Sequence, residues 1–187
     1  HQKEIRAAQN IAAHYQVELL NLDLAKIFEH SNAALMTHSK NEIPKESYAK
    51  QLEQLGGKPV STYVPFRNGL FLSSAASIAL SKDCGVIYYG PHRDDAAGSA
   101  YPDCSEAFNS AMNQAIFIGS GEQLKVEAPL ISMTKAEVVK TGLDLKVPYA
   151  LTWSCYEGTE KPCGKCGTCL DRIAAFEKNG VKDPLMD

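Results

Sequence analysis

The chain has 187 residues, of which 44% are hydrophobic, and it carries a formal net charge of −3. This composition is typical of one folded domain, or of one domain with a small appendage. No run of about 18 apolar residues and no secretory signal is present, so we expect neither a membrane contact nor secretion. An acidic chain lacks the broad positive field of non-specific nucleic-acid binders, so we expect no nucleic-acid partner.

Hydrophobic periodicity and capping residues predict helices and strands that alternate along the chain. The expected helices span about residues 3–15, 48–55, 70–80, 105–117, 134–142 and 170–178. The expected strands span about residues 17–22, 86–90 and 124–130. Alternation of this kind indicates an α/β fold with a mostly parallel sheet. We expect an α/β nucleotide and substrate domain over residues 1–150 and a zinc-binding region over residues 151–187.

Four cysteines lie near the C-terminus. The last three form two overlapping Cys-x-x-Cys motifs, and the first precedes them. They form what we call the four-cysteine knot: Cys155, Cys163, Cys166 and Cys169. Zn²⁺ favours four such ligands in a tetrahedron, and four protein ligands leave no open position, so we expect one structural zinc ion. The cations expected to offset part of the thiolate charge are Lys161, Lys165 and Arg172.

Two other readings of the knot are a redox disulfide and an iron–sulfur cluster. The bacterial ferredoxin pattern requires a further cysteine where this chain has Ile173, so that match fails. We expect Cys84 and Cys104, which stand apart, to be small buried hydrophobes. Clustered cysteines in a chain of this length favour a reduced, cytoplasmic interior over a secreted disulfide scaffold.

Several motifs occur in a fixed order before the last three cysteines. They are Val64-Pro65-Phe66-Arg67-Asn68, Tyr101-Pro102-Asp103-Cys104, Pro129-Leu130-Ile131-Ser132-Met133-Thr134-Lys135-Ala136-Glu137, Leu151-Thr152-Trp153-Ser154-Cys155-Tyr156 and Pro162-Cys163-Gly164-Lys165-Cys166. In this order they closely resemble the 7-cyano-7-deazaguanine synthase family of queuosine precursor biosynthesis. The resemblance runs from residue 1 to about residue 184, and the ordered combination is far more specific than any single motif.

The resemblance implies an ATP pyrophosphatase-loop fold, also described as adenine nucleotide alpha hydrolase-like. It implies a ligase that converts 7-carboxy-7-deazaguanine and ammonia to the nitrile, with ATP and Mg²⁺ as co-substrate, and a possible homodimer. The family opens with a strand and a Ser-Gly-Gly-x-Asp-Ser loop that cradles the ATP phosphates. This segment is missing from the 187 residues, so we expect them to bind zinc but to form no nitrile and to consume no ATP.

Five residues within the matching motifs are candidates for the active site. The resemblance implies substrate or nucleotide contacts for Arg67, Asn68, Tyr101 and Asp103. Lys135 is the catalytic candidate, because a cation in the first turn of a helix is slightly unfavourable and a phosphate contact would compensate for it.

Simpler structural roles remain open for several of these residues. Asn68 would serve as the N-cap of the helix over 70–80, and Asp103 as a cap of the helix over 105–117. Asp94 and Asp95 belong to a solvated loop or help to hold Mg²⁺. Trp153 packs in the core or stacks on a flat base.

Two other functions compete with the ligase. One is another zinc-containing enzyme of the ATP pyrophosphatase-loop fold that modifies tRNA, which predicts a basic surface and a catalytic cysteine pair outside the knot. The other is a non-catalytic zinc-ribbon binding module, which predicts exposed basic and aromatic residues around the knot.

Overall fold

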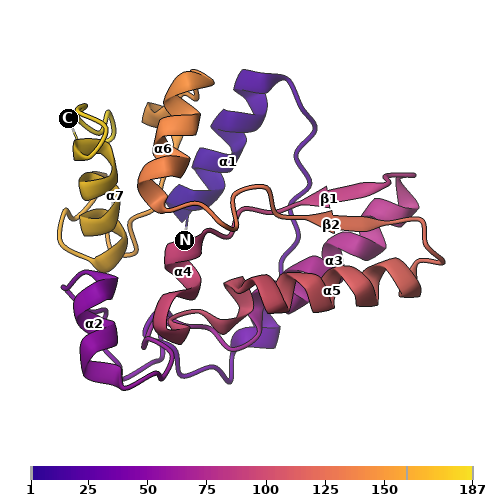
Figure 1. The fold of residues 1–187 in the computed structure, drawn as a ribbon, viewed down its shortest axis with the longest axis horizontal. Helices are drawn as coiled ribbons and strands as arrows, with labels where there is room; N and C mark the ends of the chain where they lie inside the picture. The colour runs from indigo at the N-terminus through magenta and orange to yellow at the C-terminus, as the bar shows by residue number, and fades with distance from the viewer. Residues whose placement is uncertain (1, 159, 187) are drawn as a thin grey trace.

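The computed structural model describes residues 2–158 and 160–186, which form helices around a small parallel sheet (Figure 1). The helices are α1 (Gln2–Tyr15), α2 (Tyr48–Leu55), α3 (Arg67–Ser81), α4 (Arg93–Ala96), α5 (Glu106–Gly119), α6 (Lys135–Asp144) and α7 (Gly167–Glu177). Short 3-10 helices lie between them: η1 (Ala25–Phe28), η2 (Ala97–Ser99), η3 (Pro102–Cys104) and η4 (Tyr149–Leu151). The described strands are β1 (Val86–Tyr88) and β2 (Lys125–Glu127).

The sheet is parallel, as predicted, with Ile87 of β1 opposite Val126 of β2. A parallel pair requires a long connection, and here the crossover contains α5. Helices α3 and α5 pack against the strands and lie below them in Figure 1. The buried side chains of this core are Leu72, Ile116, Leu124 and Val126. Burial of each such side chain stabilises the fold by about 1.5–3 kcal/mol. This core therefore fixes the positions of the loops that follow the strands.

The strand expected over residues 17–22 is wrong, because this segment has no regular secondary structure. Its apolar side chains are exposed, at 60% for Val17, 50% for Leu20 and 52% for Leu22. A strand requires a neighbouring strand to satisfy its backbone. In the sheet of the described residues, β1 and β2 pair only with each other. The other two expected strands are confirmed but are shorter than predicted.

The expected helices are confirmed, but α3 and α7 begin earlier than predicted, at Arg67 and Gly167. Helix α3 begins at Arg67, so Asn68 is not its N-cap; Phe66 holds that position with a φ of 56°. Helix α6 begins with the expected capping box. Thr134 Oγ1 accepts the Glu137 N–H at 3.2 Å, and Glu137 Oε2 accepts the Thr134 N–H at 2.7 Å. The division into two regions at residue 150 stays a prediction.

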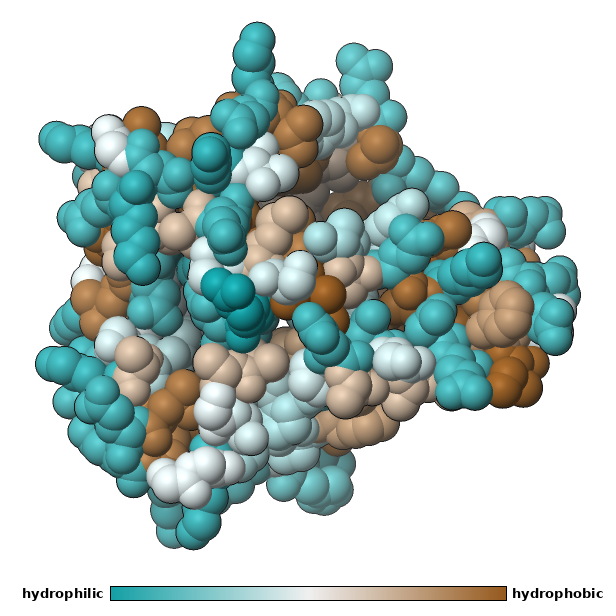
Figure 2. All heavy atoms as spheres, viewed as in Figure 1, coloured by the Kyte–Doolittle hydropathy of each residue, from teal (hydrophilic) through white to brown (hydrophobic). Residues whose placement is uncertain are grey.

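Hydrophilic residues cover most of the face shown in Figure 2, and hydrophobic residues are exposed among them near the strands and α5. Tyr88 at 66% and Ile118 at 65% are among the exposed large hydrophobics. None of the helices within residues 2–158 and 160–186 has the length and apolarity needed to span a membrane.

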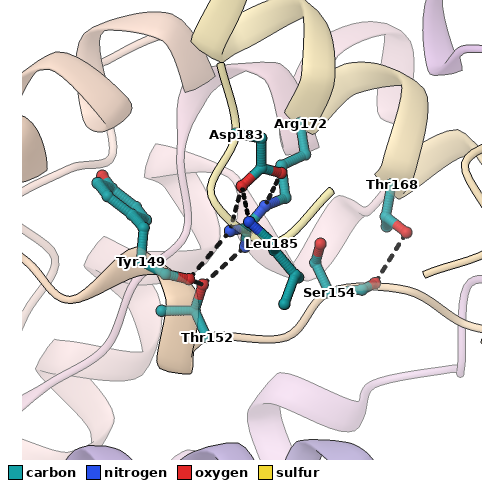
Figure 3. Close-up of polar contacts among 7 residues, drawn as sticks. All are labelled: Tyr149, Thr152, Ser154, Thr168, Arg172, Asp183 and Leu185. Atoms are coloured by element: carbon teal, nitrogen blue, oxygen red, sulfur yellow. Dashed lines mark hydrogen bonds and ion pairs between the residues drawn. The ribbon is translucent and has the colours of Figure 1, made fainter. Parts of the chain in front are cut away.

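A buried ion pair joins α7 to the C-terminal segment (Figure 3). Arg172 donates from Nε and Nη2 to the two carboxylate oxygens of Asp183 at 2.6 and 2.9 Å. It also donates to Thr152 Oγ1 at 2.8 Å and to the Tyr149 carbonyl at 3.3 Å. Since Asp183 neutralises the guanidinium, the expectation that Arg172 offsets the charge of the four-cysteine knot is corrected.

We expect Asp183→Asn to lower the free energy of unfolding by about 3 kcal/mol, because the Arg172 charge would remain buried without its counter-charge. Urea denaturation followed by circular dichroism measures this change. The control is Glu18→Gln, which breaks the exposed ion pair with Lys82 at 2.8 Å and should leave the free energy of unfolding nearly unchanged. An equally small effect of both substitutions would contradict the importance assigned to the buried pair.

Candidate functional site

Four cysteine sulfur atoms meet at the N-terminal end of α7, all within 4.8 Å of one another. They belong to the four residues predicted to bind a metal: Cys155, Cys163, Cys166 and Cys169. Cys166 is the N-cap of α7 and Cys169 lies in its first turn, where the helix dipole favours a thiolate. Gly164, at a φ of 70°, allows the tight turn between Cys163 and Cys166.

Backbone N–H groups point at these sulfur atoms. The N–H groups of Gly158 and Cys163 donate to Cys155 Sγ at 3.0 and 3.2 Å, and the Cys166 N–H donates to Cys163 Sγ at 3.3 Å. Bonds of this kind stabilise thiolate charge. Metal–sulfur bonds of about 2.3 Å in a tetrahedron place sulfur atoms about 3.8 Å apart, so the observed grouping fits one metal ion.

A cavity of about 310 Å³ lies beside the knot, and the five active-site candidates line it. Its lining includes Arg67, Asn68, Tyr101, Asp103 and Lys135. These residues come from α3, from η3 and the residue before it, and from the start of α6. The structure therefore brings the five candidates together in one site, and the role of each stays a prediction.

Asp103 is buried, and it caps a different helix from the one predicted. Its Oδ2 accepts the Asn68 N–H at 2.9 Å, and its carbonyl accepts Asn68 Nδ2 at 3.1 Å. The carboxylate thus caps α3, while Ser105 Oγ caps α5 by accepting the Phe108 N–H at 3.1 Å. The prediction that Asp103 caps α5 is therefore wrong. Within residues 2–158 and 160–186, Asp103 Oδ1 has no hydrogen-bond donor.

The two isolated cysteines have different environments. Cys104 is buried in the cavity wall, as expected, and its Sγ lies 3.2 Å from Asn68 Nδ2. Burial, with the nearby Asp95 and Asp103 carboxylates, raises the pKa of Cys104 to about 12, so the thiol stays protonated and unreactive near neutral pH. Cys84 is exposed, so its expected burial is wrong.

Asp94 and Asp95 each bind the start of a helix. Asp94 Oδ2 accepts the Lys135 N–H at 2.8 Å, which joins α4 to α6. Asp95 Oδ2 accepts the His92 N–H at 3.3 Å, and its other oxygen lies 3.3 Å from His92 Nε2. Burial is the main reason that the pKa of His92 is lowered, which favours the neutral imidazole. These bonds place the Lys135 side chain at the cavity.

Sequence reasoning missed a set of tyrosines in the cavity wall. Besides Tyr101, the lining includes Tyr48, Tyr63, Tyr89 and Tyr156. The ring of Tyr101 packs edge-to-face against Tyr48, with centroids 5.6 Å apart. No spacing rule connects residues 48, 101 and 156, so only the tertiary structure identifies them as neighbours.

Trp153 stands next to the knot and not in the cavity lining. Its Nε1 donates to the Cys155 carbonyl at 2.8 Å, and Lys3 Nζ lies 5.7 Å from the ring centroid. This arrangement agrees with a packing role.

Comparisons with known proteins point to one family. The sequence matches the family described as "Queuosine biosynthesis protein QueC" over residues 1–180. It is 40% identical over 187 residues to the 7-cyano-7-deazaguanine synthase of Archaeoglobus fulgidus, which covers 100% of this chain and 74% of that protein. It is 40% identical over 186 residues to the enzyme of the same name from Nitratiruptor sp., with 98% and 80% covered. The match to that of Methanoregula boonei is 37% over 187 residues, with 99% and 81% covered.

We expect Cys163→Ser to lose the bound metal and to be less soluble, because three remaining thiolates cannot order residues 155–169. Elemental analysis of the purified protein measures the metal content. Cys84→Ser is the control, since Cys84 is exposed and outside the knot, and it should keep the full complement. Iron in the unsubstituted protein, or a full zinc complement in Cys163→Ser, would overturn the assignment.

Proposed function

The chain belongs to the QueC family of queuosine biosynthesis proteins, and on this basis we propose that it converts 7-carboxy-7-deazaguanine and ammonia to 7-cyano-7-deazaguanine with ATP. The observation that carries the proposal is the meeting of Arg67, Asn68, Tyr101, Asp103 and Lys135 in one cavity. Its volume of about 310 Å³ suits a flat bicyclic ring with its reacting group.

The proposed reaction removes both oxygens of a carboxylate. ATP first activates the carboxylate as an acyl-adenylate with release of pyrophosphate, and ammonia displaces AMP to give the amide. A second activation by ATP occurs at the amide oxygen, and loss of AMP and a proton leaves the nitrile. Water would hydrolyse either activated species, so the site must exclude it while stabilising charge on phosphate and acyl oxygens.

The charged side chains of the cavity divide between these tasks. We assign the phosphate and acyl oxygens to the cations Arg67 and Lys135. We assign the amino edge of the deazaguanine ring to Asp103, whose Oδ1 is open to a donor. Asn68 holds Asp103 through two hydrogen bonds, and Tyr101 supplies an aromatic wall.

We propose that the four-cysteine knot holds one structural Zn²⁺. Four thiolates satisfy a tetrahedral ion, and the ion supplies a cross-link worth on the order of 10 kcal/mol to local folding. The chain's own residues beside the ligands, Tyr156 and Thr168, line the cavity. Thr168 Oγ1 also donates to the Ser154 carbonyl at 2.8 Å (Figure 3). The knot thereby orders one wall of the site.

We further propose a cytoplasmic homodimer that uses Mg²⁺ with its ATP. A reduced compartment suits the six unpaired cysteines. Exposed apolar side chains along residues 17–22 and at the end of the sheet suit contact between copies.

The full-length protein should form 7-cyano-7-deazaguanine when supplied with 7-carboxy-7-deazaguanine, ammonium and Mg-ATP. Mass spectrometry of the product, with ¹⁵N-ammonium as the nitrogen source, measures the reaction directly. Protein purified from cells without a native synthase removes background. ATP consumption with no nitrogen incorporation, or incorporation without ATP, would contradict the proposed reaction.

We expect Asp103→Asn to weaken binding of 7-carboxy-7-deazaguanine at least about tenfold while leaving ATP affinity within about twofold, because the ring contact loses its charged acceptor while the remaining amide oxygen still accepts the Asn68 N–H. Isothermal titration measures each ligand separately. Asp144→Asn, at the end of α6 and outside the cavity, is the matched control. Equal losses of affinity for both ligands, or a lower melting temperature alone, would show that Asp103 acts only as the cap of α3.

A further inference from the structure

Three tyrosine hydroxyls and one threonine hydroxyl form a continuous chain in the cavity wall. Thr62 Oγ1 lies 2.7 Å from the Tyr101 hydroxyl, which lies 2.9 Å from that of Tyr48, which lies 2.9 Å from that of Tyr156. We call these four residues the hydroxyl chain. Its members come from the loop before α3, the loop before η3, the first residue of α2 and the residue after Cys155.

The direction of the hydrogen bonds follows from counting protons. The geometry makes Tyr101 the donor to Tyr48, so the Tyr101–Thr62 bond must use the Thr62 proton. Tyr48 then donates to Tyr156, since otherwise its own proton would be buried without an acceptor. The proton of Tyr156 is left over. Its nearest acceptor in the chain, the Tyr101 oxygen, is 3.4 Å away, which is a long hydroxyl bond.

The exposure of the chain members agrees with this direction. Thr62, Tyr101 and Tyr48 are buried, at 2%, 7% and 9% exposure, while Tyr156 is only partly buried and lines the cavity. Tyr48 and Tyr101 also line the cavity, so Tyr156 is distinguished by its proton, which no short bond within the chain uses. The cations Arg67 and Lys135 line the same cavity.

Burial keeps the middle of the chain protonated. Desolvation is the main cause that raises the pKa of Tyr48, so this phenol does not become a phenolate near neutral pH. Each hydroxyl that accepts one bond and donates the next is polarised by its neighbour, which strengthens the terminal donor.

Building on the proposed function, we propose that the Tyr156 hydroxyl donates a hydrogen bond to the reacting carboxyl oxygen of the substrate. The hydroxyl chain behind it holds and polarises this donor. When ammonia attacks the activated carboxyl carbon, negative charge develops on that oxygen, and a fixed donor stabilises it. A neutral donor suits an oxygen acceptor, whereas the N–H groups of the ring require an acceptor such as Asp103.

The position of Tyr156 next to the metal ligand Cys155 gives the knot a part in this role. The Cys155 sulfur accepts N–H groups from both sides of the loop, at 3.0 Å from Gly158 and at 3.2 Å from Cys163. The backbone that carries Tyr156 is thereby fixed on its knot side, and the hydroxyl chain fixes the ring's other end. A donor held at both ends loses little entropy when substrate binds.

The test compares Tyr156→Phe, Tyr48→Phe and a control, Tyr88→Phe, in the full-length protein. Tyr88 is 66% exposed on β1 and outside the cavity. We expect Tyr156→Phe to lower kcat about 100-fold with the KM for ATP within about twofold, as for loss of one oxyanion donor. Tyr48→Phe should lower kcat about tenfold, because Tyr156 loses the bond that orients it. Tyr88→Phe should match the unsubstituted protein.

Zinc content and melting temperature are measured alongside the kinetics, so a structural role gives a different result. Retained zinc with an unchanged kcat in Tyr156→Phe overturns the inference, as does an equal rise in KM for ATP and for the deazaguanine without a change in kcat. If Tyr156→Phe loses zinc, the result for Tyr48→Phe is used instead. A lower kcat in Tyr48→Phe that retains zinc supports the inference, and an unchanged kcat in that variant overturns it. An unsubstituted protein that makes no nitrile refutes the proposed function instead.

Discussion

Four thiolates within 4.8 Å of one another would repel one another strongly, and a bound cation would offset that repulsion. Much of the site depends on this constraint. The knot fixes the N-terminal end of α7, and α7 holds the C-terminal segment through the Arg172–Asp183 pair. On its other side it places Tyr156 and Thr168 in the cavity wall. The proposed metal has no open coordination position, so it would shape a site in which it takes no chemical part.

Asp103 illustrates how the cavity combines stability with preorganisation. Its carboxylate is at the N-terminus of α3, where the helix dipole stabilises negative charge. The same bond sets the position of the first turn of α3, which carries Arg67. Contact with a buried acid therefore places the backbone of a cavity cation before any ligand arrives. Such rigidity favours ligands whose donors and acceptors match that spacing.

The parts of the structure that the sequence predicted are those governed by local chemistry. The knot was predictable because its ligands lie within a short segment and few chemistries use that spacing. The capping box at Thr134 and Glu137 is equally local. The meeting of Arg67, Asp103 and Lys135 was expected from resemblance and not from spacing. The hydroxyl chain was missed because Tyr48, Tyr101 and Tyr156 meet only through tertiary packing. The prediction of a strand over residues 17–22 failed because an apolar segment forms a strand only beside another strand that satisfies its backbone hydrogen bonds.

The exposed thiol of Cys84 affects how the assembly state of this protein can be studied. In air, two exposed thiols on separate molecules oxidise readily to a disulfide, whereas the buried, protonated Cys104 does not take part. A covalent pair formed through Cys84 would have the mass of a homodimer on a sizing column without sharing its interface. Adding reductant to the buffer, or substituting Cys84→Ser, removes the disulfide. Any dimer that remains is then formed by non-covalent contacts, such as those of the exposed apolar side chains of residues 17–22.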